Sequence, residues 1–150
     1  NSALIFLLKK LIKKYKIRIE NVLGHSDIAP YRKIDPGKNF PWEILENRKI
    51  SYGVQFINRS NIDRNLIDKI FHKNKLNSIK KKILFMLNFI GYDISLAKKN
   101  RFYFNQLISA YSNHFKIYKN HYYNKKKIFN VIELHFLNII LTKNKKTNKS

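Results

Sequence analysis

The sequence predicts an α/β fold in the first third of the chain, followed by a small all-α helical bundle. Three patterns indicate this: apolar residues at helical spacing open the chain, a short apolar stretch follows, and four further helical patterns fill the region after residue 60. The 150 residues suffice for one ordinary domain or two small ones. The absence of cysteine excludes a disulfide framework and any cysteine-based zinc or nucleophile site.

The first third begins with an amphipathic helix, expected at about residues 3–16. Its apolar positions lie opposite a lysine face; they are Leu4, Leu7, Leu8, Leu11, Ile12 and Tyr15. Residues 17–23 are expected to form a short buried strand, and residues 24–39 a loop rich in turn residues. Pro41 suits the first turn of a further helix, whose Trp42, Ile44 and Leu45 would pack against the core.

A linker is expected at residues 51–60. It would separate a unit at 1–50 from a helical module at 61–142, which a disordered basic tail at 143–150 follows. Ser60 and Asp63 have the spacing of a capping box, and Gly91 is a natural helix stop. Four sets of apolar positions predict the helices of the module: Ile62, Leu66, Ile67, Ile70 and Phe71; Leu76, Ile79, Ile83, Leu84, Leu87 and Ile90; Phe104, Leu107, Ile108, Tyr111 and Phe115; and Ile128, Val131, Ile132, His135, Phe136 and Ile139.

The formal net charge of +22 is extreme, and residues 61–150 contribute +15 of it, from nineteen Lys/Arg against four Asp/Glu. A basic surface attracts polyanions such as nucleic acid, anionic lipid or acidic cell-wall polymers. Lys, Asn and Ile are all over-used, however, as in A/T-rich coding sequence, and we take this bias as the main cause of the charge. Because no nucleic-acid module is recognisable, specific nucleic-acid binding ranks last among the functions.

The start of the chain carries no recognisable leader. It opens at Asn1 without an initiator Met, so we expect a processed or excised piece. Residues 3–8 are apolar but too few to span a bilayer, and the lysines follow them, which is the reverse of the order in a signal peptide. No targeting or transmembrane segment is visible in the sequence.

The loop at residues 24–39 holds the residues most capable of chemistry. His25 enters it, and Asp35 follows ten positions later. Lys33 precedes Asp35 by two, which places both side chains on one face of an extended segment. A neutral imidazole, a carboxylate and a nearby cation make up most of a catalytic zinc site, in which the metal lowers the pKa of water and polarises a carbonyl. One protein ligand is missing.

The other candidates are weaker. Asp27 is expected to have a structural role, such as orienting a loop amide. Phe40 and Trp42 fit either a substrate groove or the core. His72, His114, His121 and His135 show no metal-ligand spacing with one another, and His135 falls on an apolar helical face, as a core histidine would.

The segment GHSDIAPYRKIDPGKNFPW resembles the C-terminal motif of the zinc-dependent N-acetylmuramoyl-L-alanine amidases, which are related to phage amidases and peptidoglycan recognition proteins. The similarity runs over about residues 4–45. It implies a mixed-sheet fold, Zn²⁺ as cofactor, His25 and Asp35 as zinc ligands, and Lys33 as the group that stabilises the transition state. Arg32 and Trp42 are the candidate substrate-binding residues.

Two departures from that family matter. Tyr31 stands where close relatives commonly have Gly. The family's first zinc histidine and its catalytic glutamate lie upstream of this motif and have no counterpart here. The chain therefore resembles the last part of the catalytic domain, and we expect it to bind zinc poorly and to expose sheet edges.

The second half resembles, more distantly, the helical peptidoglycan-binding module that often follows this catalytic domain. The resemblance lies in residues 88–93 (NFIGYD) and 110–115 (AYSNHF); the alternative is a generic helical bundle. The first hypothesis for function is therefore hydrolysis of the amide between N-acetylmuramic acid and L-alanine in peptidoglycan or muropeptides. The alternative is a non-catalytic peptidoglycan-binding or recognition protein, and a decaying or mis-split reading frame also stays open. The expected location is the cell envelope or periplasm, with the cytoplasm as the alternative.

Overall fold

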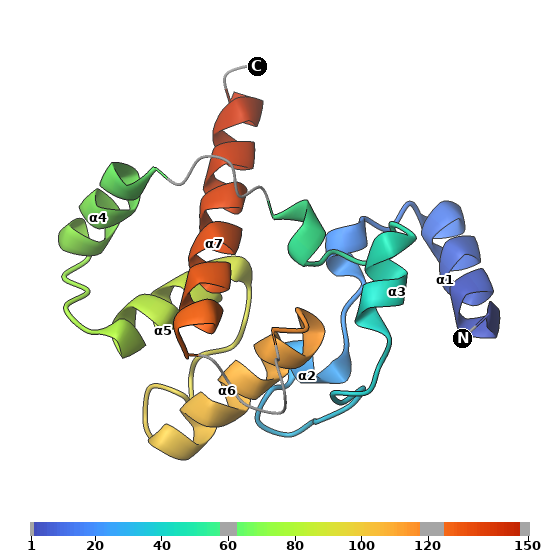
Figure 1. Cartoon of the computed structure of the whole chain (residues 1–150), viewed down its shortest axis with the longest axis horizontal. Helices are drawn as coiled ribbons and strands as arrows, with labels where there is room; N and C mark the ends of the chain where they lie inside the picture. Colours follow the sequence, from blue (N-terminus) through green and yellow to red (C-terminus); the bar gives the residue numbers. More distant parts are fainter. Residues whose placement is uncertain (1, 58–62, 118–124, 148–150) are drawn as a thin grey trace.

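The computed structural model describes residues 2–57, 63–117 and 125–147, and all regular structure within these ranges is helical. The predicted α/β fold for the first third is therefore wrong. Figure 1 shows α1 at one end of the molecule, α4 at the other, and α2 and α6 between them. The elements are α1 (Ser2–Tyr15), η1 (Ile19–Asn21), α2 (His25–Ile28), α3 (Trp42–Asn47), η2 (Val54–Phe56), α4 (Arg64–Lys73), α5 (Ile79–Ile90), α6 (Arg101–His114) and α7 (Lys125–Thr147).

The predicted strand at residues 17–23 is a single 3₁₀ turn, η1. Its backbone bonds locally: the Asn21 amide donates to the Arg18 carbonyl at 2.9 Å and the Val22 amide to the Ile19 carbonyl at 3.3 Å. A strand requires a neighbouring strand to satisfy its amides and carbonyls, and the described residues offer none. The segment therefore satisfies part of its own backbone by turning.

The helix expected at residues 3–16 is confirmed as α1. It has no buried residue, but its Ile5, Leu8 and Ile12 pack against a small apolar cluster. That cluster is built from Trp42, Leu45 and Ile50, on and just after α3. Pro41 precedes α3 as its N-cap residue rather than lying in its first turn. The expected packing of Trp42 and Leu45 on the core is confirmed, whereas Ile44 is exposed.

The larger core belongs to the part of the chain that contains α4 to α7, which we call the helical half. In it, α5 packs against α7. The helices begin at polar caps: Asp63 accepts from the Leu66 amide, Ser78 from Lys81 and Asn100 from Tyr103. Asp63 is thus itself the N-cap of α4, so the predicted capping box is wrong; Ser60 and Ile62 lie outside the described residues. Gly91 ends α5 with φ 123°, as expected. The backbone of α7 continues to Thr147, past the start of the expected tail.

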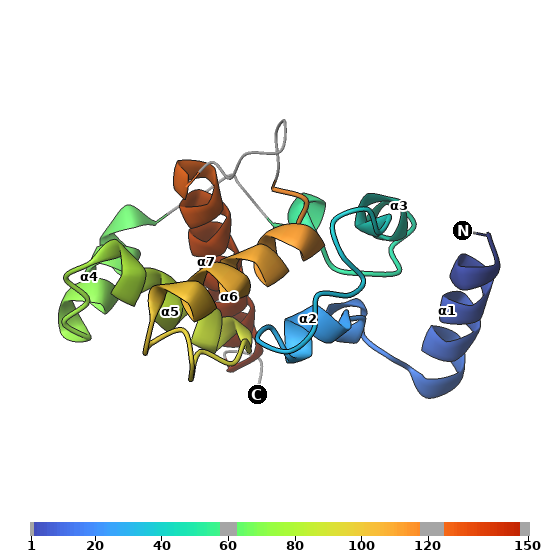
Figure 2. The same cartoon turned by 90° about the horizontal axis from the view of Figure 1, so that it is seen from below.

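The two halves of the chain meet where α2 lies against α6 (Figure 2). This contact places the loop after α2 beside the helical half. None of the helices in the described part of the chain is both long and apolar enough to cross a membrane.

Candidate functional site

The loop with the candidate ligands starts at Gly24, which is the N-cap of the one-turn helix α2. The Ser26 amide donates to the Asp35 carbonyl at 2.9 Å, which joins the two ends of the loop. Gly24 allows this closure because a Cβ there would lie 2.5 Å from Cδ of Pro36 and 3.3 Å from the Trp42 ring. The glycine of the motif therefore has a steric role: it lets the Pro36 ring approach the start of α2.

His25 and Asp35 face each other across this closure. Nδ1 of His25 lies 2.5 Å from Oδ2 of Asp35, and the two side chains are 70% and 57% exposed. A carboxylate only accepts, so His25 donates. This hydrogen bond is the main reason that the pKa of Asp35 lies below its usual value, and the charge of Lys33 lowers it further. The structure thus brings together the two predicted ligands and places the Lys33 charge close enough to act on Asp35.

The chemistry of this pair suits zinc, which takes imidazole nitrogen and carboxylate oxygen. A metal ion would displace the proton that now lies between these two donor atoms. Within residues 2–57, 63–117 and 125–147, however, no His, Cys, Asp or Glu joins the pair to make a group of three. The pair matches in type two of the three protein ligands that a catalytic zinc site uses, and its binding of zinc stays a prediction.

The remaining predicted site residues divide between surface and core. Lys33 and Arg32 are exposed on the loop, where their backbone amides both donate to the Ala29 carbonyl at 3.0 Å. Trp42 is only 4% exposed, and its indole stacks on the His114 ring with centroids 3.9 Å apart. The core position of Trp42 expected as one alternative is thus observed, and the substrate-binding role of Arg32 and Trp42 stays a prediction.

Asp27 is a buried link between the loop and the helical half. The expected structural role is confirmed, because its Oδ2 accepts from the Gly24 amide at 2.8 Å. The same carboxylate also lies 2.6 Å from Nδ1 of His114 and accepts from the Tyr92 hydroxyl at 2.7 Å. His114 was missed by spacing arguments, since its partner lies 87 positions away. No signal in the sequence alone connects the two residues.

Two further contacts join this loop to the helical half. The Tyr31 hydroxyl donates to the Asp93 carbonyl at 2.6 Å and accepts from the Ala97 amide at 3.2 Å. Nζ of Lys116 donates to the Lys38 carbonyl. Tyr31, which departs from the amidase motif that this loop resembles, therefore makes contacts that a glycine lacks.

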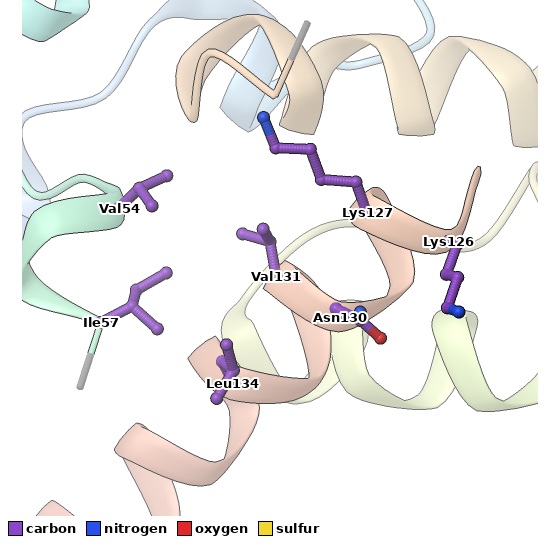
Figure 3. A pocket seen from close by; sticks show the side chains of 7 residues that line it. All are labelled: Val54, Ile57, Lys126, Lys127, Asn130, Val131 and Leu134. Atoms are coloured by element: carbon purple, nitrogen blue, oxygen red, sulfur yellow. The ribbon is translucent and has the colours of Figure 1, made fainter. Parts of the chain in front are cut away.

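Two features of the helical half lie apart from this loop. His135 is 6% exposed, as predicted for a core histidine; His121 lies outside the described residues. A pocket of about 340 Å³ opens between η2 and α7, where Val54 and Ile57 face Val131 and Leu134 (Figure 3). Its other lining residues are Lys126, Lys127 and Asn130, so it contains no residue of the candidate zinc loop.

Comparison with known proteins shows partial similarity to N-acetylmuramoyl-L-alanine amidases. It is 54% identical over 49 residues to the N-acetylmuramoyl-L-alanine amidase AmiD of Escherichia coli (strain K12), a match to 33% of this chain and 18% of that protein. It is 49% identical over 41 residues to the 1,6-anhydro-N-acetylmuramyl-L-alanine amidase AmpD of Enterobacter cloacae, a match to 27% of this chain and 22% of that protein. The AmpD of Haemophilus influenzae is 53% identical over 34 residues, 22% of this chain and 18% of that protein.

The chain spans about a fifth of the length of the curated relatives that it matches. No family model and no solved structure matches it. The resemblance to the amidases thus rests on one segment of 34 to 49 residues, and the resemblance of the helical half to a peptidoglycan-binding module stays a prediction. This chain has partial homologues among the N-acetylmuramoyl-L-alanine amidases.

Proposed function

We propose that this chain carries the metal loop of a zinc-dependent N-acetylmuramoyl-L-alanine amidase that acts on peptidoglycan or muropeptides. The observation that carries the proposal is the pairing of His25 with Asp35 at 2.5 Å on an exposed loop. The partial homologues, which are named as N-acetylmuramoyl-L-alanine and 1,6-anhydro-N-acetylmuramyl-L-alanine amidases, support the same assignment.

His25 and Asp35 would hold Zn²⁺ through Nδ1 and a carboxylate oxygen, together with a ligand from outside the described residues. When bound, zinc would supply the Lewis acidity that activates water and polarises the scissile carbonyl. The exposed ammonium group of Lys33 would stabilise the negative charge that develops on the carbonyl oxygen as the amide is attacked. An exposed loop suits a polymeric substrate, because the side chains of His25 and Asp35 are both open to solvent. We place the protein in the cell envelope, where that polymer lies.

The test is hydrolysis of a purified muropeptide by the complete protein encoded by the reading frame, in the presence of Zn²⁺. Free stem peptide is detected by mass spectrometry. We expect release by the unaltered protein, loss of release in His25→Ala and in Asp35→Asn, and unchanged release in the matched control His72→Ala, because His72 is an exposed histidine on α4, away from the loop.

Two results would count against the amidase. Release that persists in His25→Ala would remove His25 from the metal site. Binding of the muropeptide without release, by a folded and zinc-loaded protein, would favour the non-catalytic recognition protein instead.

A further inference from the structure

We propose that His114 is a positioning residue: through Asp27 it holds the loop that carries His25, Lys33 and Asp35. The helical half of the chain is then the scaffold of the metal loop, in addition to any part that it takes in binding the wall. The inference rests on the proposed function only where it concerns metal. Its structural part is independent of that function.

The contact at the centre of this proposal is a buried hydrogen bond between a histidine and a carboxylate. The side chains of His114 and Asp27 are 4% and 3% exposed, and Nδ1 lies 2.6 Å from Oδ2. On the other side of the ring, Nε2 of His114 lies 3.1 Å from the Tyr52 carbonyl. The carboxylate and the carbonyl are hydrogen-bond acceptors, and they face the two ring nitrogens of His114. A hydrogen bond to a carboxylate is stronger than one between neutral groups, and a buried polar group that loses its partner is costly.

The contact between His114 and Asp27 is connected to the candidate ligands by short steps along the backbone. Asp27 accepts from the Gly24 amide, which fixes the start of α2. Between these two residues the Ser26 amide donates to the Asp35 carbonyl. An anchored Asp27 therefore holds His25, one residue from Ser26, opposite Asp35. Removing His114 would leave the carboxylate that fixes this turn with the Gly24 amide and the Tyr92 hydroxyl, and without its contact to α6.

Other contacts of the helical half hold the same loop at Asp27 and Tyr31, which precede Lys33. The Tyr92 hydroxyl gives Asp27 a further donor, at 2.7 Å. Tyr31 is hydrogen-bonded to residues 93 and 97, and its ring meets Tyr103 edge-on at 5.5 Å. His114 stands out among these contacts because it is stacked on Trp42 as well, and so joins the loop, α3 and α6.

The test compares two variants of similar shape in the full chain. In His114→Leu the donors are lost while most of the volume is kept, and in His114→Asn an N–H donor remains near the position of Nδ1. Amide hydrogen exchange at Ser26 reports the loop closure without any metal. We expect exchange at Ser26 to be about tenfold or more faster in His114→Leu, and His114→Asn to recover most of the protection. Amides within α5 and α7 should keep their protection from exchange in both variants.

The proposal is wrong if the Ser26 amide exchanges at the same rate in His114→Leu and in the unaltered chain. It is also wrong if His114→Leu and His114→Asn raise that rate equally. If His114→Leu also loosens α5 and α7, Tyr92→Phe decides the matter, since it removes only one hydroxyl that donates to Asp27. If Tyr92→Phe speeds exchange at Ser26 but not in α7, the contacts to Asp27 hold the loop. If exchange at Ser26 is unchanged, the proposal is refuted.

A second measurement uses Zn²⁺ alone, titrated against a competing chelator. Residues bonded directly to metal ligands commonly contribute 10- to 100-fold to metal affinity. His114 is bonded to Asp27 and not to a candidate ligand, so we expect a loss of about tenfold in His114→Leu, with recovery in His114→Asn and no loss in His72→Ala. This titration uses the complete protein encoded by the reading frame. If that protein does not bind Zn²⁺, the proposed function is wrong, while the exchange at Ser26 would still decide the role of His114.

Discussion

The buried histidine of α7 is expected to make this protein sensitive to acid. Burial, aided by the nearby charge of His114, lowers the pKa of His135 from 6.5 to about 3. The ring is hydrogen-bonded to the Tyr111 hydroxyl at 3.1 Å and packs beside Tyr52 and Phe115. The folded protein therefore keeps His135 neutral at pH values at which the unfolded chain would protonate it.

The size of the effect follows from this difference in proton uptake. Below pH 6.5 the unfolded state binds a proton at His135 and the folded state does not, so acidification favours unfolding until the pH approaches 3. Over most of this interval, each pH unit of acidification lowers the free energy of unfolding by about 1.4 kcal/mol. Since little of the uptake has occurred at pH 7 and most of it at pH 5, the stability attributable to His135 falls by about 2 kcal/mol between these values.

The assay is urea denaturation followed by circular dichroism at pH 7 and at pH 5. His135→Gln keeps a hydrogen-bonding group for Tyr111 but does not titrate, so it should lose about 2 kcal/mol less than the unaltered chain on acidification. His72→Gln, at an exposed position, is the matched control and should lose as much as the unaltered chain. A His135→Gln variant that is destabilised by acid as strongly as the unaltered protein would refute the assignment to His135.

Two other substitutions test packing and charge elsewhere in the chain. Gly24→Ala puts a Cβ 2.5 Å from the Pro36 ring and 3.3 Å from Trp42, and should lower the free energy of unfolding by about 1–3 kcal/mol in chemical denaturation; unchanged stability would contradict the steric role of Gly24. Arg64→Ala removes the guanidinium that lies 2.6 Å from the buried Glu133 carboxylate. Because burial already raises the pKa of Glu133, this substitution should lower the free energy of unfolding by about 2 kcal/mol. Glu133→Gln in the Arg64→Ala background should recover part of that loss, since the amide is neutral, and no recovery would argue against a cost in charge burial.

The sequence was sufficient where a structure depends on neighbours within a few turns. The spacing of apolar residues predicted α1 and the helices after residue 63, and Gly91 marked the end of α5. His135 was predicted to lie in the core because it falls on an apolar helical face, and it does. In each case the deciding contacts are local or depend only on which face of a helix is apolar.

The sequence was insufficient where the deciding partner is distant. Residues 17–23 have the composition of a strand, but a strand forms only beside another one, and within the described ranges the segment finds none. His114 carries no motif of its own, and its role depends on Asp27, which the fold brings to it from 87 positions away. The pairing of His25 with Asp35, ten residues apart and joined by a closed loop, was within reach of the motif.

The short helix α2 explains why the site and the helical half are coupled energetically. A helix of four residues cannot persist on its own propensity, because nucleation costs more than one turn returns. Its two central side chains, Ser26 and Asp27, are buried, while His25 and Ile28 point to solvent. One face of this turn thus anchors it and the other presents the candidate ligand. Since the anchor is a carboxylate bonded to α6, we expect part of the free energy that keeps His25 in place to come from the helical half, and a change that loosens α6 should alter the metal loop.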